Sequence, residues 1–413
     1  MSNAVKTVSM IAKEAIMILE NELVAAKLVH RGYDEEYGRN PNGYKIGSTI
    51  TIRKPTDFTV RDGATASNQD VTEGSTSIVV NKQKGIDFQF TSQELALEMN
   101  QLSERVIKPA MIQLANQIDR DILGLYSSVP SWVGTPGQVV NSFADFGVGP
   151  QRLDEFAVPQ ESRAGLLSPA DQWGMLGSQT ALYIQEAAKG AYRDGSLGMI
   201  GGVDTYMSQN VPLHTVGVAT GTPKVNGASQ NVTYASVKDS NTQTLNTDGW
   251  TNSTTGILKA GDVFTIAGVY AVNPVTKQTL PFLRQFTVTA DADSGASTGP
   301  AALTITPAII TSGAFQTCSA APADNADITV VGTGGTSYRQ NMIFHKNAFA
   351  LVTVPMEAPQ GAVNVSRQSY KGINVRLVPY YDGTNDISKW RLDVLYGVKA
   401  IDPRLATRIS GTA

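Results

Sequence analysis

The stretch Ala191-Tyr-Arg-Asp-Gly-Ser-Leu-Gly-Met-Ile-Gly-Gly-Val-Asp-Thr-Tyr-Met-Ser-Gln-Asn-Val-Pro212 decides the fold of this chain. It stands just ahead of a segment rich in Thr, Gly and Val that contains Leu258-Lys-Ala-Gly-Asp-Val-Phe-Thr-Ile-Ala-Gly-Val-Tyr270. From residue 216 to 340 charged residues become sparse and Val/Thr alternation dominates, as in Phe286–Ala290 and Leu303–Thr306. Short strands separated by Gly, Pro and Asn-Pro turns predict a small β-barrel or sandwich, inserted into a domain that begins upstream and finishes with the C-terminus. The residues expected to form its core are Val263, Ile266, Val269, Phe286, Val288, Leu303 and Ile305.

The composition excludes several classes of protein. The chain has 413 residues, of which 41% are hydrophobic and 17% charged, and its formal net charge is -3. This balance predicts several domains with real cores, and no global basic field that would attract nucleic acid or anionic lipid. The single cysteine, Cys318, excludes an intrachain disulfide and a multi-cysteine zinc site, and fits assembly in a reducing cytoplasm.

Neither a signal peptide nor a membrane span is expected. The apolar residues Ile16–Leu19 are followed at once by Glu20 and Glu22, without the small-residue pattern of a cleavage site. Nowhere do about 18 apolar residues run together, which is the length that a membrane-spanning helix needs. We therefore expect a soluble protein that is made inside the cell.

Residues 5–29 predict an amphipathic helix. Its apolar stripe repeats at steps of three and four residues, and Lys13, Glu20 and Lys27 flank it; the stripe consists of Val8, Ala12, Ala15, Leu19, Leu23 and Ala26. A lone N-terminal helix has no core of its own. It must therefore dock on its own chain or on a neighbouring molecule.

Residues 41–90 predict a long two-stranded excursion. Thr49–Arg53, Ser77–Val80 and Ile86–Phe90 have strand patterns, and Asp62–Asp70 forms a polar middle. Such a hairpin is marginal alone and needs an external partner surface. Its basic residues Arg53, Lys54 and Arg61 fit either a solvated face or salt bridges to a neighbouring subunit.

A capping box at Thr91-Ser-Gln-Glu94 predicts the start of a long helix that runs to about residue 127. Pro109 falls inside this run and should kink the helix or divide it. Further along, Gly165-Leu-Leu-Ser-Pro-Ala-Asp-Gln-Trp173 predicts a strand that leads into a helix with Pro near its start.

Motifs that suggest chemistry lack their structural context. Gly295-Ala-Ser-Thr-Gly299 fits the serine-hydrolase pattern, but Pro300 and a β-type run follow it, so it predicts a hairpin loop. Asp291-Ala-Asp-Ser-Gly295 resembles the start of a calcium loop, yet its Gly comes one position early and Ala302 stands at the twelfth position. The histidines lack the spacing of metal ligands, and basic residues do not cluster with aromatic ones. Gly332–Ser337 predicts a flexible linker where the insert rejoins its host.

Three local patterns resemble the coat proteins of short-tailed double-stranded DNA phages, the P22-like coat protein family. They are the 191–212 block, the segment that contains Leu258–Tyr270, and Arg391–Val398 followed by Pro403. The resemblance implies an α+β Hong Kong 97-type shell fold. In that scheme the chain comprises an N-terminal arm (1–40), an E-loop (41–90), a spine helix (91–127), a peripheral domain (128–205), an axial domain (206–215 and 341–413) and an inserted β-barrel domain (216–340).

The resemblance also implies a function. It predicts a major capsid protein that assembles with copies of itself, in hexamers and pentamers, into an icosahedral shell around the phage DNA, without catalysis, cofactor or metal. A scaffolding protein, a portal, decoration proteins and non-specifically contacted double-stranded DNA are the implied partners, and the virion and the host cytoplasm the locations. The residues expected at subunit interfaces are Arg53, Lys54, Arg61, Asp62, Lys13 and Glu20. A β-rich virion adhesin or tail component is the alternative, and a hydrolase that uses Ser297 is a third reading.

Overall fold

The computed structural model describes residues 3–32, 49–61, 63–65, 68–91, 106–179, 197–359, 361 and 364–412. The chain divides into two compact units. Met1–Thr51, Ser77–Leu123 and Phe349–Lys399 form the first, and Ile52–Thr76, Gly124–Ala348 and Ala400–Ala413 form the second. None of the described helices is long and apolar enough to span a membrane.

The N-terminal helix of the first unit is divided in two. α1 (Asn3–Glu22) and α2 (Ala25–Leu28) replace the single helix predicted over residues 5–29. The residues of the predicted apolar stripe from Ala12 onward are buried, including Ala15 and Leu19. α1 packs against α5 and against strands β18 and β19, so it docks on its own chain.

The described part of the predicted spine helix is α5 (Lys108–Leu123). Pro109 is the second residue of α5, which follows directly after the π-helical residues 106–107. The buried face of α5 includes Met111, Leu114, Ile118 and Ile122. Residues 92–105, the first part of the predicted helix, lie outside the described residues.

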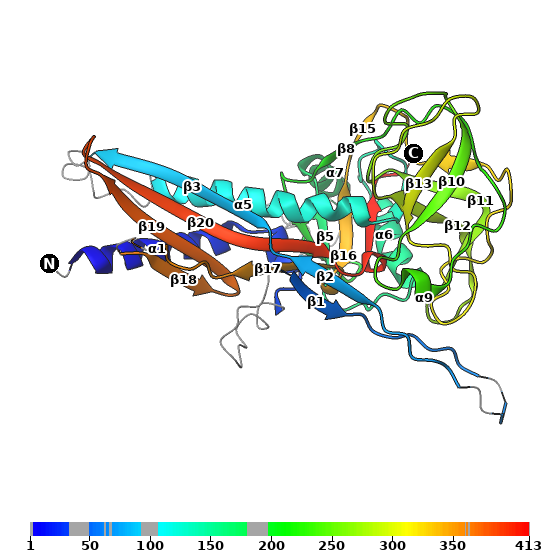
Figure 1. The fold of residues 1–413 in the computed structure, drawn as a ribbon, viewed down its shortest axis with the longest axis horizontal. Helices are drawn as coiled ribbons and strands as arrows, with labels where there is room; N and C mark the ends of the chain where they lie inside the picture. Colours follow the sequence, from blue (N-terminus) through cyan, green and yellow to red (C-terminus); the bar gives the residue numbers. More distant parts are fainter. Residues whose placement is uncertain are drawn as a thin grey trace. The chain divides into compact units, whose positions relative to one another are not determined.

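A long antiparallel sheet completes the first unit (Figure 1). Its central strand β20 (Ile387–Ala400) pairs with β19 (Ile373–Asp382) and, from Ile387↔Thr91 to Tyr396↔Lys82, with β3 (Lys82–Thr91). β18 (Ser366–Tyr370) and β17 (Phe349–Val354) join the same sheet. β1 (Thr49–Arg53) and β2 (Ser75–Val79) form a separate two-stranded sheet. The last strand of the expected E-loop therefore belongs to a large sheet.

The second unit contains a six-stranded mixed sheet. Its order is β4 (Trp132–Val133), β21 (Ala406–Ile409), β16 (Asn341–His345), β5 (Arg163–Leu167), β7 (Val203–Met207) and β6 (Met199–Ile200). Two helices contribute to its core, α6 (Phe143–Glu155) and α7 (Pro169–Gln179). β5 followed by α7, with Pro169 at the first helical position, confirms the strand and helix predicted for residues 165–173.

This sheet crosses the expected boundary between a peripheral domain (128–205) and an axial domain (206–215 and 341–413). β16 pairs with β5, and β21 pairs with β4, so both segments contribute to one sheet. Residues 349–399, expected in the axial domain, group instead with α1 and α5 in the first unit. Alternation of apolar and polar residues identifies a strand but does not indicate which distant strand pairs with it. The observed grouping of the segments therefore differs from the expected domains.

The predicted β-barrel is confirmed within the second unit. Its strands run in the order β14 (Ile328–Val330), β11 (Val263–Val272), β12 (Thr279–Val288), β13 (Ala301–Thr306), β10 (Gln243–Trp250) and β9 (Gly221–Val225). A bridge between Lys224 and Asp327 joins the two edges. The predicted core residues are buried and six of them form one cluster, which includes Ile266, Val269, Phe286, Val288, Leu303 and Ile305. Val263 packs instead with Trp132, Val216 and Tyr338.

The segment Gly332–Ser337 is ordered, which corrects the prediction of a flexible linker. Gly335 N donates to Val216 O at 3.1 Å, and Val216 N donates to Thr336 O at 3.1 Å. A Cβ at Gly334 would lie 2.1 Å from Val218 O, so this close backbone contact requires glycine. β8 (Leu213–Thr215) and β15 (Ser337–Arg339) continue the pairing. The chain therefore enters and leaves the barrel at the same place.

Candidate functional site

The enzyme-like motifs lie in the loop between strands β12 and β13 of the barrel. Ser297 has a positive φ of 73° and stands between β12 and β13, with no helix after it. Asp291 accepts a hydrogen bond from Ala260 N at 2.8 Å, and Asp293 accepts one from Gly256 N at 2.6 Å. Across the part of the chain that the structure describes, no group of three His, Cys, Asp or Glu could hold a metal ion. The two aspartates fasten neighbouring loops.

The clearest candidate for contact with another molecule is the segment between β1 and β2, residues 54–74, here termed the exposed loop (Figure 1). Three apolar side chains on it are open to solvent: Phe58, Val71 and Val60, the last fully exposed at 100%. Thr59 N donates to Gln69 Oε1 at 2.9 Å, and Gln69 Nε2 donates to Thr59 O at 2.6 Å. The amide side chain of Gln69 thus connects two irregular stretches of the loop, which carry the exposed apolar side chains.

The base of the exposed loop is anchored on the second unit. Lys54 Nζ donates to Asp239 O at 3.0 Å, and the Asp239 carboxylate accepts from both Ser75 N at 2.8 Å and Ser75 Oγ at 2.9 Å. The Ser75 hydrogen bonds hold the pKa of Asp239 below its ordinary value. Asp57 lies 3.7 Å from Arg404. A fixed base below an open tip is suited to reaching another molecule.

The predicted interface residues do not form one cluster. Arg53 is 84% exposed in its side chain and lies 3.7 Å from Glu73, while Arg61 donates to Thr65 O at 3.1 Å. Lys54 is committed to the loop base, and Asp62 lies outside the described residues. The remaining two residues, Lys13 and Glu20, both lie on α1.

Lys13 is exposed on α1, whereas Glu20 is buried. Glu20 Oε2 accepts from Arg31 at 3.1 Å, and Lys371 lies 3.9 Å from its other oxygen. Because Glu20 flanks the apolar stripe of the predicted helix, its side chain was expected to face outward. The sheet that packs on α1 covers it instead. The exposed apolar residues Phe58, Val60 and Val71 were in turn missed, because the loop reads as polar in sequence.

A buried charge network lies below the barrel, within the second unit. The guanidinium of Arg408, on β21, donates to Gly261 O at 2.7 Å, to Gln340 Oε1 at 3.2 Å and to Thr287 Oγ1 at 3.3 Å. It also lies 5.6 Å from the Trp132 ring centroid. Burial lowers the pKa of Arg408 to about 9. The side chain connects β21 to β12 and to the turn before β11.

His214 makes a second connection between β8 and the same turn. Its Nε2 lies 2.7 Å from Asp262 Oδ1, and its Nδ1 lies 3.0 Å from the Tyr126 hydroxyl. Asp262 also accepts from Gly217 N at 3.0 Å and Lys259 N at 2.7 Å. A neutral imidazole with its hydrogen on Nε2 satisfies both contacts. Because His214 and Asp262 are both buried, their contact connects β8 to the barrel.

Comparisons with known proteins agree on one family. The family model described as "P22 coat protein - gene protein 5" matches residues 1–411. The major capsid protein of Acyrthosiphon pisum secondary endosymbiont phage 1 is 22% identical over 342 residues, which cover 80% of each chain. Among solved structures, one from Mycobacterium phage Che8 has a TM-score of 0.48 at 12% identity and covers 94% of this chain and 90% of its own. The CUS-3 coat protein I-domain is 28% identical, with a TM-score of 0.19, over 27% of this chain and 96% of its own.

Proposed function

The chain belongs to the P22 coat protein family and is a phage major capsid protein, and from this premise we propose that it builds its shell through the exposed loop of residues 54–74. As a family member it has the Hong Kong 97-type shell fold that the sequence predicted. The match over residues 1–411 removes the alternative of a virion adhesin or tail component. Its place is the virion, as a component of the capsid.

The observation that supports the loop as a contact element is its exposed apolar surface on an anchored base. The apolar side chains of Phe58, Val60 and Val71 are exposed to water. Their burial against a neighbouring subunit would stabilise the contact by about 25 cal/mol per Å2 of apolar surface. A shell needs many identical contacts that are each weak, because strong ones would trap misassembled copies. A narrow loop with three apolar side chains fits that requirement.

Charged residues accompany the apolar ones in this proposal. Arg53, Arg61 and Lys13 are exposed and able to form salt bridges with another subunit at a contribution of about 0–1 kcal/mol each. Glu20 and Lys54 act inside their own subunit, since Arg31 pairs with Glu20 and the backbone of Asp239 accepts from Lys54. Asp62, which lies outside the described residues, remains a proposed interface residue.

The arrangement of the subunits and the other molecules that the shell contacts are part of the same proposal. Copies of the chain arranged in hexamers and pentamers form the shell, and a scaffolding protein, a portal and decoration proteins assist or join it. The DNA is contacted without sequence specificity, in agreement with a net charge of -3 that provides no strong attraction. Assembly takes place in the host cytoplasm, where the buried free thiol of Cys318 stays reduced. The protein has no catalytic role in this proposal.

Electron microscopy of the purified protein tests the role of the loop. The double substitution Phe58→Ser with Val60→Ser should leave the subunit folded and strongly reduce the yield of closed shells. Val275→Ser is the matched control, because Val275 is 72% exposed on the turn between β11 and β12 and lies outside the loop. Normal shells from the double variant would reject the loop as a contact element, and a double variant that fails to fold would assign these residues to the core.

A further inference from the structure

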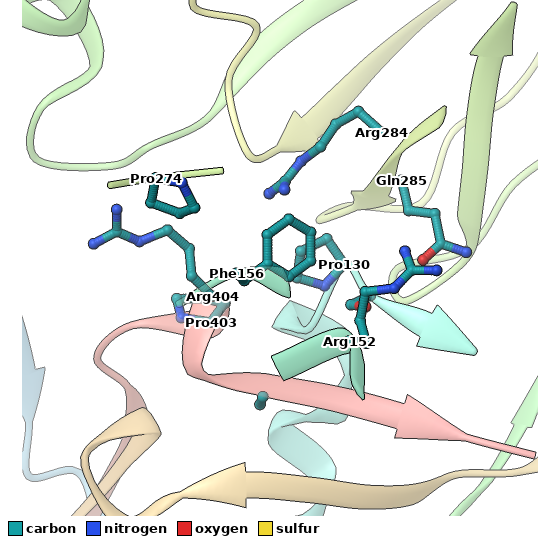
Figure 2. Close-up of a pocket in the computed structure, with 10 residues that line it drawn as sticks. Pro130, Arg152, Phe156, Pro274, Arg284, Gln285, Pro403 and Arg404 are labelled. Carbon is teal, nitrogen blue, oxygen red and sulfur yellow. The ribbon is translucent and has the colours of Figure 1, made fainter. Parts of the chain in front are cut away.

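A small cavity lies between β12, α6 and the short helix η6 (Pro403–Leu405), all within the second unit (Figure 2). Its volume is about 20 Å3, which exceeds the roughly 10–15 Å3 that a single water molecule needs. Three prolines, Pro130, Pro274 and Pro403, supply rigid walls, and proline has no N–H to donate. Three arginines complete the lining, which gives the cavity an unusual surplus of cationic donors.

Arg284 is the arginine without a counter-ion. It is only 6% exposed, and its guanidinium carbon lies 5.0 Å from the centroid of the Phe156 ring. Figure 2 shows the Arg284 side chain pointing toward that ring. Its Nε is buried and has no hydrogen-bond partner. Throughout the described part of the chain no carboxylate pairs with Arg284, and the charged groups that act on it include Arg152 and Arg404, both of the same sign.

The other two arginines already have carboxylate partners. Arg152 lies 3.4 Å from Glu155, and Arg404 lies 2.8 Å from Asp402. The amide of Gln285 is also committed, because it exchanges hydrogen bonds of 2.8 and 2.7 Å with the backbone of Trp132. Arg284 is therefore the group whose charge and donors are left over at the cavity.

Leaving that charge alone is unfavourable. Burial lowers the pKa of Arg284 to about 10, so the side chain still carries its charge at neutral pH. An unpaired ion inside a protein is destabilising, and a cation–π contact offsets only part of that penalty. The low dielectric of the apolar walls strengthens the attraction of the arginine for any anion that enters.

We propose that this cavity is a binding site for one small inorganic anion of the chloride type, held by Arg284 between Phe156 and the proline walls. The small volume favours a monatomic ion over the larger phosphate and sulfate, and the unpartnered Nε of Arg284 supplies a donor for it. Arg152 and Arg404 add attraction from its rim. The bound ion joins β12 of the barrel to α6 and η6, so it stabilises the attachment of the barrel.

Chloride-35 NMR of the full-length, unassembled protein measures this binding directly. A chloride ion that exchanges with a buried site broadens the chloride resonance, and unlabelled bromide should reverse the broadening by competition. The wild-type protein should broaden the line, and Arg284→Met should lose this excess broadening. Arg53→Met, at an exposed arginine on β1, is the matched control and should retain it. Equal broadening by all three proteins, or none by the wild type, would overturn the proposal.

A second measurement covers the case in which Arg284→Met does not fold. Wild-type crystals soaked in bromide should show an anomalous peak beside Arg284 Nε, and a cavity without that peak would overturn the proposal. In addition, the Tm of the wild type should be higher in sodium chloride than in sodium gluconate at equal ionic strength, since gluconate is too large to enter. A Tm that is the same in both salts would argue against a stabilising ion.

Discussion

Arg408 shows at the scale of one residue how the second unit tolerates a buried charge. Its guanidinium is fully buried and donates hydrogen bonds to three acceptors in distant parts of the chain. The nearest of these acceptors in sequence is 68 residues away. Its Nε remains without a partner. Such a side chain orders its neighbours because each buried acceptor would otherwise remain unsatisfied.

Replacement of this arginine should be strongly destabilising. Arg408→Ala removes the donors to Gly261 O, Gln340 and Thr287 and leaves a cavity beside Trp132, so the free energy of unfolding should fall by about 3–5 kcal/mol. Urea unfolding of the unassembled protein measures the change. Arg53→Ala, at an exposed arginine, should change it by less than about 0.5 kcal/mol. Similar values for the two variants would contradict the structural role of Arg408.

Asp145 offers a test that depends on pH. Burial by itself raises the pKa of this carboxyl, but the hydrogen bonds from Thr412 and Asn141 outweigh burial and hold the pKa below its ordinary 3.8. A lowered carboxyl pKa stabilises the fold above the ordinary value, and this contribution is lost as the pH falls through the folded-state pKa. Asp145→Asn should therefore be less stable than the wild type at pH 7. The two should converge below about pH 3.8, as followed by thermal unfolding, and a constant difference would reject this account.

Residues of this kind mark the limit of prediction from sequence. The buried stripe of α1 was predictable because helical period alone selects Ala12, Ala15 and Leu19. The burial of Glu20 was not, because it depends on a sheet formed by residues beyond 365. His214 and Asp262 are 48 residues apart, and nothing in their local sequence indicates that they meet.

At the scale of elements, α1 depends on one face. Leu19 is fully buried in the contact with α5 and the long sheet, whereas Met17, on the same helix, is 49% exposed. α1 is too short and too isolated to persist without that contact, since most helical stability in proteins comes from packing.

Two alanine variants on this helix separate packing from helix propensity. Leu19→Ala should lower the free energy of unfolding by about 2–5 kcal/mol, because it removes buried methyl groups and leaves a cavity. Met17→Ala should change it by less than about 0.5 kcal/mol. Urea titration followed by circular dichroism measures both. Equal losses would mean that α1 is stabilised through something other than its buried face.

Helices and strands that have a local sequence pattern were predicted better than the pairing between strands. Thr49–Arg53 alternates so regularly that β1 has the predicted bounds, and Pro169 marked the start of α7 correctly. β3 was predicted as a strand of a hairpin, yet its partner is β20, about 300 residues later in the chain. The order of a mixed sheet depends on contacts between distant segments, and a single sequence does not record them.

At the scale of the whole molecule, the barrel is a closed structure within a host chain. Its edges meet at Lys224 and Asp327, and its core cluster lies within residues 225–328. The entry at Val216 and the exit at Gly335 are hydrogen-bonded to each other. An inserted domain needs its ends close together and a core of its own, and residues 216–340 meet both conditions.

A fragment of residues 216–340 should therefore fold without the rest of the chain. Its amide NMR spectrum should be dispersed, and its thermal unfolding should be cooperative, since the six predicted core residues from Ile266 to Ile305 contact one another inside the barrel. Its Tm should nevertheless be lower than that of the barrel in the whole protein. The fragment lacks His214, Arg408 and Trp132, so Asp262 and Thr287 each lose a hydrogen-bond partner and Val263 becomes more exposed. The fragment variant Val263→Thr should lose little stability, whereas Phe286→Ala should cost about 3–5 kcal/mol. A disordered fragment would mean that the barrel core is completed by the host, and the proposed boundaries would then have to be abandoned.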